Sequence, residues 1–248
     1  MLSAATSHET SDGKPPIDYK VATAEDLSFI ESGSVDMVTA GQSAHWFKHE
    51  KSFPEIARIL KPGGTLAFFC TSPKATILSK IDLQVSLHGT DLTLLGYGNF
   101  SIKGNKDLTS LLQKYIYGGP GTLGPYWEEP GRSIVVSLYR DIHPPESLYK
   151  DITRLYFPRK SVSGETEQTV GIAAKMTIRM FYAYGRTWSS YHGWQNAFPQ
   201  RKSRESGGEG DILDEMCDAL KMETGWDDDT EFEVEWNSGV LLARKKEL

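Results

Sequence analysis

The chain has 248 residues, of which 39% are hydrophobic and 24% are charged. These values are typical of a soluble globular protein and exclude collagen-like, wholly disordered and membrane-spanning classes. The 27 Lys and Arg against 33 Asp and Glu give a formal net charge of −6, which provides no general attraction to nucleic acid or to an anionic membrane, so we expect neither as a partner.

The first third of the chain alternates predicted strands with a predicted helix. Residues 17–22 alternate apolar and polar side chains, which predicts a short strand, and the β-branched residues of 35–40 predict a second strand. Residues 53–60 carry apolar side chains at helical spacing, and the Lys-Pro-Gly-Gly of 61–64 is expected to end that helix. Residues 65–70 are nearly all apolar, which predicts a strand buried on both faces of a parallel sheet. Strand, crossover helix and strand together predict an open α/β sheet.

The middle of the chain is less regular. A helix is predicted over 108–117, and shorter apolar segments follow at 133–139 and 152–157. Residues 177–194 predict a helix with an aromatic face. The polar, glycine-rich residues 200–210 predict a mobile surface loop.

The end of the chain is expected to return to the sheet. A final helix is predicted over 211–223, with Asp211 as its N-cap. Residues 232–236 alternate and residues 240–243 are fully apolar, which predicts strands that form a hairpin turning at 237–239.

The cysteine and histidine spacings do not indicate a metal site. Cys70 and Cys217 each lack a second cysteine nearby, and Cys70 follows an apolar run, so we expect a core thiol rather than a nucleophile. His45 and His49 have the i, i+4 spacing of zinc ligands, but no third ligand is indicated, and we expect no metal. No serine lies in a nucleophile elbow, and we name no catalytic residue.

Targeting signals are also lacking. No apolar stretch approaches the roughly 18–20 residues that span a bilayer. The first residues lack the basic and apolar regions of a secretory signal. We therefore expect a cytoplasmic location.

A glycine-rich segment at 119–124 has the spacing of a dinucleotide-binding fingerprint. That fingerprint requires a buried strand before it and a helix N-terminus after it, because helix amides hold the phosphates. Here a predicted helix precedes the glycines and a Pro-Tyr-Trp segment follows them. We therefore predict a flexible lid or loop.

Ligands of open α/β sheets lie at the carboxyl ends of the parallel strands. For the predicted strand ending at Ala40 these positions are 41–46, and for the strand ending at Ala22 they are 23–26. The alternative for residues 45–47 is a hydrophobic staple at the start of the next helix.

Motifs along nearly the whole chain resemble class I S-adenosylmethionine-dependent methyltransferases. They are AEDL at 24–27, SVDMVTA at 34–40, AHWF at 44–47 and LKPGG at 60–64. Further motifs are similar to the trans-aconitate methyltransferase-like branch, namely GPYW at 124–127, RTWSSY at 186–191 and LARK at 242–245. The resemblance implies a Rossmann-like α/β sheet with a helical or loop cap and S-adenosyl-L-methionine as cofactor.

The sequence departs from the family pattern at its beginning. Family members carry a Gly-x-Gly-x-Gly turn near the methionine moiety of the cofactor and a strand ending in an acidic residue that holds the ribose. This sequence contains neither before residue 17, and Thr23 stands where relatives often have Asp. The resemblance therefore implies an N-terminally incomplete sheet.

The resemblance also implies roles for individual residues. Ala24 and Glu25 would border the adenine. Gln42, His45 and Trp46 would line the junction between cofactor and acceptor, where Trp46 could face the sulfonium through a cation–π contact.

Acceptor binding is assigned to another group of residues. Arg186 and Trp188, with Tyr126 and Trp127 of the predicted lid, are the candidates, because acceptor carboxylates favour arginine forks. The alternative is that these aromatic residues pack a helical cap and that the arginine lies in solvent. A carboxylate acceptor is ionised at neutral pH and needs no general base, so positioning and exclusion of water would suffice.

Residues 1–248 are thus read as one methyltransferase-type domain. Within it, 1–75 form a partial Rossmann-like core, 76–200 the cap and acceptor side, and 211–248 the returning helix and strands. The expected activity is methylation of a small carboxylic acid. The alternative is a truncated, catalytically inactive methyltransferase-like protein that binds no cofactor. An unpaired side of the strand ending at Ala40 predicts self-association through that edge.

Overall fold

The computed structural model describes residues 17–72, 101–102, 106–157 and 172–247. Its α-helices are α2 (His49–Ile59), α3 (Lys106–Tyr117), α4 (Gly131–Val136), α5 (Ile178–Gly185), α6 (Ser189–Ala197) and α7 (Ile212–Thr224). Short 3-10 turns are η1 (Ala44–Trp46), η3 (Gly124–Tyr126) and η4 (Arg204–Ser206).

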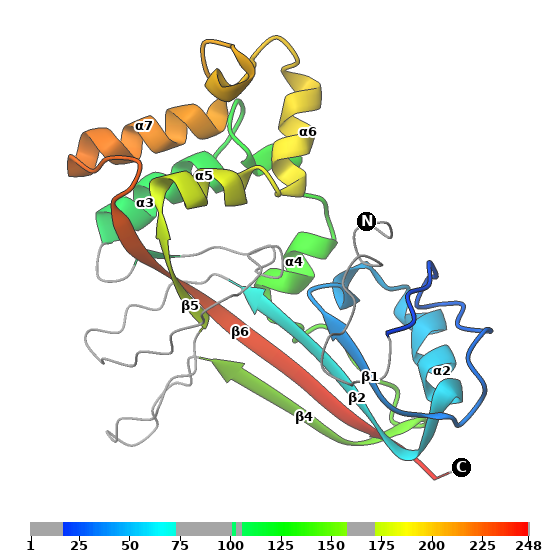
Figure 1. Cartoon of the computed structure of the whole chain (residues 1–248). Helices are drawn as coiled ribbons and strands as arrows, with labels where there is room; N and C mark the ends of the chain where they lie inside the picture. Colours follow the sequence, from blue (N-terminus) through cyan, green and yellow to red (C-terminus); the bar gives the residue numbers. More distant parts are fainter. Residues whose placement is uncertain (1–16, 73–100, 103–105, 158–171, 248) are drawn as a thin grey trace, which may run out of the picture.

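The sheet is mixed and is organised around one long strand. β1 (Val35–Gly41) pairs in parallel with β2 (Leu60–Ser72), and β2 pairs antiparallel with β6 (Glu231–Lys245). β6 also pairs antiparallel with β4 (Tyr149–Phe157), which gives the order β1-β2-β6-β4 (Figure 1). The other end of β6 pairs with β3 (Ser101–Ile102) and β5 (Ile172–Thr177).

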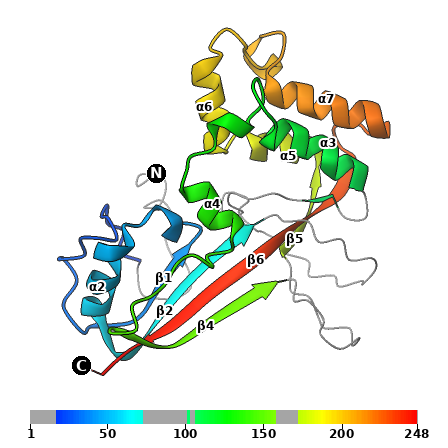
Figure 2. The same cartoon turned by 180° about the vertical axis from the view of Figure 1, so that it is seen from behind.

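Two hydrophobic cores lie along β6. In the first, Phe53 and Ile56 of α2 are buried against Phe68 of β2. In the second, α3, α5, α6 and α7 gather around buried residues such as Trp194 and Trp236 (Figure 2). Because β6 contributes to both cores, it joins the strand–helix–strand part of the fold to the helical cap.

The strand–helix–strand unit predicted over residues 35–70 is confirmed. β1, α2 and β2 follow one another as expected, and the pairing of Val38 with Leu66 places both predicted strands in one sheet. The first predicted strand is wrong, because residues 17–22 form no strand. Ile17 and Val21 are exposed, so no described residue covers the apolar side of this segment.

The interpretation of β2 as a strand of a purely parallel, fully buried sheet is wrong in part. Its second neighbour, β6, runs antiparallel, and Phe69 is half exposed. Cys70 is buried as expected, and burial raises the pKa of its thiol to about 12, which suits a core residue.

The predicted C-terminal hairpin is also wrong. β6 runs through residues 237–239 without turning, and Gly239 pairs with Cys70 of β2. A Cβ at Gly239 would lie 2.8 Å from the carbonyl oxygen of Leu138. The glycine therefore permits a close approach of two backbones, rather than a turn.

The predicted aromatic helix over 177–194 is two helices. α5 ends at Gly185, where a Cβ would lie 3.0 Å from the Leu213 side chain of α7. α6 begins after Trp188. The break turns α6 away from α5 and lets both helices pack in the cap (Figure 1).

The segment predicted as a mobile surface loop is anchored on α7. Arg201 pairs with Glu215 and Arg204 pairs with Asp218. The α7 prediction itself is confirmed: Asp211 accepts hydrogen bonds from the backbone N–H groups of Leu213 and Asp214 and closes a capping box.

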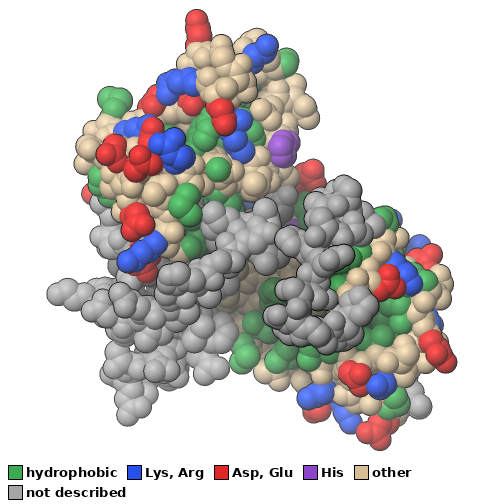
Figure 3. Space-filling model, viewed as in Figure 1, with side chains coloured by type: hydrophobic (Ala, Val, Ile, Leu, Met, Phe, Trp, Pro, Cys, Tyr) green, Lys and Arg blue, Asp and Glu red, His purple; other side chains and the backbone are tan. Residues whose placement is uncertain are grey.

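Surface charges alternate in sign over the described residues on the face shown in Figure 3. In the four described stretches, no helix combines the length and apolar character needed to cross a membrane. The same stretches contain no cluster of His, Cys, Asp and Glu residues placed to hold a metal ion.

Candidate functional site

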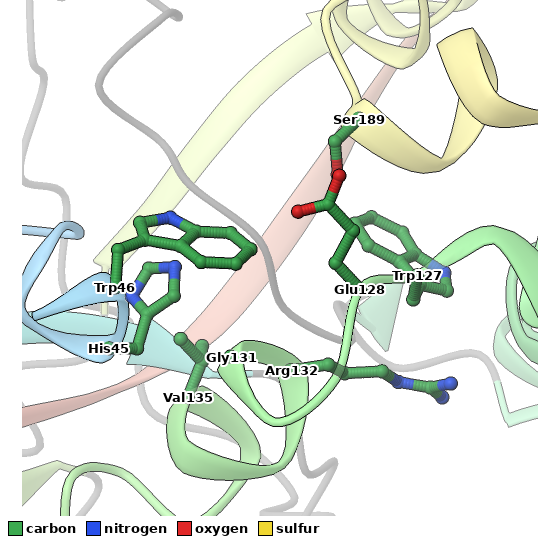
Figure 4. A pocket seen from close by; sticks show the side chains of 8 residues that line it. All are labelled: His45, Trp46, Trp127, Glu128, Gly131, Arg132, Val135 and Ser189. Atoms are coloured by element: carbon green, nitrogen blue, oxygen red, sulfur yellow. The ribbon is translucent and has the colours of Figure 1, made fainter. Parts of the chain in front are cut away.

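A hollow lies between the sheet and the cap, where the carboxyl end of β1 meets α4 and the start of α6 (Figure 4). It contains about 210 Å³ of space, including its open side. Because this space includes open solvent, the hollow is far smaller than a complete ligand pocket. The lining residues are His45, Trp46, Trp127, Glu128, Gly131, Arg132, Val135 and Ser189.

The sheet side of the hollow is built by the turn after β1. Gln42 has a positive φ of 50°. Its side-chain amide accepts a hydrogen bond from the backbone N–H of Thr71 at 2.8 Å and donates one to the Thr71 carbonyl at 3.2 Å. These two hydrogen bonds join the ends of β1 and β2. The chain then continues into η1, which carries the lining residues His45 and Trp46.

His45 and Trp46 differ strongly in exposure. The His45 side chain is 4% exposed, and burial lowers its pKa from 6.5 to about 4. Trp46 is 45% exposed, and its ring centroid lies 4.7 Å from that of His45. The hollow therefore has a neutral imidazole beneath an accessible indole.

The cap side supplies an aromatic ring and polar side chains. Trp127 stands near the carboxylate-bearing Glu128 and the hydroxyl of Ser189, across the hollow from Trp46 (Figure 4). Arg132 also lines the hollow, and its guanidinium lies 4.8 Å from the ring centroid of Tyr117. The lining thus combines aromatic rings with one carboxylate and one guanidinium group.

The structure brings His45, Trp46 and Trp127 together, as the predicted site requires. Trp188 is buried behind Trp127, with 6.1 Å between their ring centroids. Tyr126 packs its ring on Phe198, at 6.4 Å. These last two predicted residues therefore support the cap side of the hollow without lining it.

The other predicted site residues lie elsewhere. Arg186 bonds to the Tyr182 hydroxyl and pairs with Glu205 at 3.3 Å. Glu25, which follows Ala24 in the turn after residue 23, accepts a hydrogen bond from the backbone N–H of Lys48 at 2.7 Å. That bond lowers the pKa of the Glu25 carboxyl.

Sequence reasoning missed Glu128, Arg132 and Ser189. Two of them belong to or adjoin motifs that the sequence analysis named, since Glu128 follows the Gly-Pro-Tyr-Trp segment and Ser189 lies inside Arg-Thr-Trp-Ser-Ser-Tyr. The adjacency could have suggested Glu128 and Ser189. Arg132 had no such signal, because its place depends on how α4 packs on η1.

We predict that replacing Gly131 with alanine disturbs the hollow. The added Cβ would lie 2.9 Å from Trp46 Cζ3 and 3.1 Å from His45 Cδ2, so the indole must move. We expect a change in tryptophan fluorescence and weaker ligand binding, because the indole must leave its position against His45. Gly119→Ala is the matched control, since nothing lies within 4 Å of its Cβ position. Equal spectra and affinities for the two variants would contradict the prediction.

The chain was compared with known families, sequences and structures. Residues 1–68 match the family model described as methyltransferase domain. The chain is 28% identical over 259 residues to a Saccharomyces cerevisiae protein named "probable S-adenosylmethionine-dependent methyltransferase CRG1", with 100% of this chain and 76% of the relative covered. It is 23% identical over 240 residues to a Dictyostelium discoideum protein assigned as a methyltransferase, with 96% of this chain and 70% of the relative covered.

A solved structure with a similar fold covers most of this chain. It is a protein assigned as a type II methyltransferase from Anaeromyxobacter dehalogenans, with a TM-score of 0.56 and 21% sequence identity. The match covers 93% of this chain and 73% of the other. It confirms the Rossmann-like α/β fold class that the sequence predicted.

Proposed function

We propose that this chain is an S-adenosylmethionine-dependent methyltransferase that methylates a small carboxylic acid such as trans-aconitate in the cytoplasm. The match of residues 1–68 to the methyltransferase domain and the 28% identity to the Saccharomyces cerevisiae relative support the methyltransferase part of the proposal. The observation that carries the proposal is the arrangement of Trp46 and Glu128 on opposite walls of the hollow at the carboxyl end of β1.

The residues of the hollow suit the sulfonium end of the cofactor. The accessible face of Trp46 can attract a cation, the Glu128 carboxylate adds a negative charge, and the neutral His45 does not repel it. When bound, S-adenosylmethionine supplies an electrophilic methyl group. Its nucleoside needs more space than the hollow offers, so the described residues provide only one part of the cradle.

The acceptor side can orient a carboxylate. Arg132 stacks on Tyr117, and stacking leaves the in-plane N–H groups of its guanidinium for a carboxylate oxygen. The Ser189 hydroxyl can donate a further hydrogen bond. These groups would hold an ionised acceptor on the Trp127 side of the hollow, where Figure 4 shows the Arg132 guanidinium and the Ser189 side chain. Positioning of the acceptor and exclusion of water are what methyl transfer to a carboxylate requires.

Calorimetry and a methylation assay test this proposal. We expect the purified chain to bind S-adenosylmethionine and to form a methyl ester with trans-aconitate. Binding without ester formation would overturn the carboxylic acid substrate. A calorimetric titration without measurable heat would contradict cofactor binding, and it would favour the catalytically inactive alternative.

We predict that Trp46→Leu weakens binding of S-adenosylmethionine by about 2- to 30-fold, which corresponds to a cation–π contact of about 0.5–2 kcal/mol. Binding of S-adenosylhomocysteine, which lacks the positive sulfur, should change much less. Phe29→Leu is the control, because Phe29 is 46% exposed and lies outside the hollow. Equal losses for both ligands would rule out the cation–π role.

We further propose that two copies of the chain associate through β1. In the described part of the chain β1 pairs only with β2, and Met37 on β1 is 53% exposed. Met37→Lys should convert a dimer to a monomer in sedimentation experiments, because a charge disfavours strand pairing. Met222→Lys on α7, where Met222 is 87% exposed, should leave the dimer intact. A wild-type monomer at all concentrations would contradict this proposal.

A further inference from the structure

Tyr139 reaches the hollow-lining His45 from a distant part of the chain. It follows α4, its side chain is 1% exposed, and its hydroxyl lies 3.2 Å from His45 Nδ1. Leu138 and Tyr139 both have positive φ, at 57° and 61°. Such backbone is costly for residues other than glycine and persists where the surroundings enforce it, often at functional sites. The strained turn places the Tyr139 hydroxyl against η1.

The hydrogen bonds of the Tyr139 hydroxyl determine which histidine nitrogen carries the proton. Backbone hydrogen bonding from Ala44 and His45 lowers the pKa of the Tyr139 hydroxyl against the rise that burial causes, which indicates that these N–H groups point toward its oxygen. With its oxygen engaged in this way, the hydroxyl has its proton left for His45 Nδ1. A neutral imidazole that accepts a hydrogen bond at Nδ1 carries its own proton on Nε2.

The Nε2 side of the ring faces the hollow. A Cβ on Gly131, which lines the hollow, would lie 3.1 Å from His45 Cδ2, and Cδ2 is bonded to Nε2. Figure 4 shows the imidazole beneath the Trp46 indole at the edge of the open space.

We propose that Tyr139 is a positioning residue that fixes the Nε2–H tautomer of His45, so that the imidazole donates a hydrogen bond to a carboxylate bound in the hollow. The carboxylate belongs to the acceptor or to the amino-acid end of the cofactor, and the donor role therefore rests on the proposed function. A neutral donor suits the hollow, because an imidazolium at His45 would repel the sulfonium of bound S-adenosylmethionine.

The surroundings favour the neutral ring. Burial lowers the pKa of His45 to about 4. The charged groups that share the hollow are Glu128 and Arg132 on the α4 side. On α2, burial also lowers the pKa of His49, whose Nε2 bonds to the Ala44 carbonyl. At neutral pH, His45 thus acts as a hydrogen-bond donor without a charge.

The tautomer can be measured without any ligand or activity. Long-range ¹H–¹⁵N NMR of histidine-labelled protein should show the Nε2–H form of His45, and Tyr139→Phe should give a mixture of both tautomers. Tyr149→Phe is the matched control, because that buried hydroxyl belongs to the same core but donates to the Phe53 carbonyl. An Nδ1–H form in the wild type, or an unchanged tautomer in Tyr139→Phe, would overturn the inference.

The source of the carboxylate is distinguished by two titrations of the same sample. S-adenosylhomocysteine and trans-aconitate are added separately, and the ligand that shifts the His45 Nε2–H resonance identifies the source. We expect Tyr139→Phe to weaken binding of that ligand by about two- to fivefold, because only the fraction of His45 in the Nε2–H form can donate to it. If both ligands bind by calorimetry and neither moves the resonance, the donor role is wrong. Absence of binding would instead refute the proposed function and leave the tautomer result standing.

Discussion

Lowering the pH from 7 to 4 is expected to remove about 3 kcal/mol from the free energy of unfolding through His45 alone. Burial lowers the pKa of His45 from 6.5 in the unfolded chain to about 4 in the folded chain. Between these values the unfolded chain binds a proton that the folded chain does not. The stabilisation is therefore fully present above pH 6.5 and is lost as the pH falls to about 4.

Urea denaturation of the wild type and of His45→Gln at both pH values measures this effect. Glutamine does not titrate, so the variant should lose about 3 kcal/mol less than the wild type on acidification. Other titrating groups contribute equally to both proteins and cancel. His49→Gln is the second comparison, because the pKa of His49 is also lowered by burial but is partly restored by the Ala44 carbonyl. Identical acid losses in the wild type and His45→Gln would show that His45 titrates normally.

Replacing Asp211 with alanine is expected to lower the free energy of unfolding by about 3 kcal/mol. Asp211 is fully buried and caps α7 through the backbone N–H groups of Leu213 and Asp214. Its second oxygen accepts a hydrogen bond from the Tyr191 hydroxyl at 2.5 Å. Alanine removes the cap, at a cost of about 1 kcal/mol, and leaves a buried hydroxyl without its acceptor, at about 1–3 kcal/mol.

Two further variants separate these contributions. Asp211→Asn keeps an oxygen for the helix amides and should lose less than the alanine variant. In Tyr191→Phe the hydroxyl is already absent, so adding Asp211→Ala to it should cost only the cap. Thermal or chemical denaturation provides the free energies. Additive losses in the double variant would contradict the coupling between Asp211 and Tyr191.

The helices and strands that bury one face could be predicted from local sequence patterns. α2 and α7 were predicted because their apolar spacing and caps lie within a few residues of one another. β1 and the central part of β2 were predicted because consecutive apolar or β-branched residues favour strands. The placement of His45 and Trp46 followed from a general rule, since side chains after a parallel strand lie at the ligand-binding edge.

Patterns failed where a distant partner decided the structure. Residues 17–22 alternate like a strand but pair with no strand in the described part of the chain, and residues 237–239 look like a turn but lie inside β6. A glycine is needed at position 239, but the reason is the close approach of the Leu138 backbone rather than a turn. The contacts of Arg186 with Tyr182 and Glu205 likewise depend on tertiary structure, and no local pattern indicated them.

The amino-acid sequence by itself determined the strand–helix–strand unit, its polar and aromatic edge residues and the resemblance to methyltransferases, because each depends on neighbours close in the chain. Only the tertiary structure decided that Glu128 and Arg132 share a hollow with Trp46, and that Tyr139 contacts His45. These contacts join segments about a hundred residues apart, and their geometry depends on how α4 packs against the sheet. Local propensity carries no information about that packing.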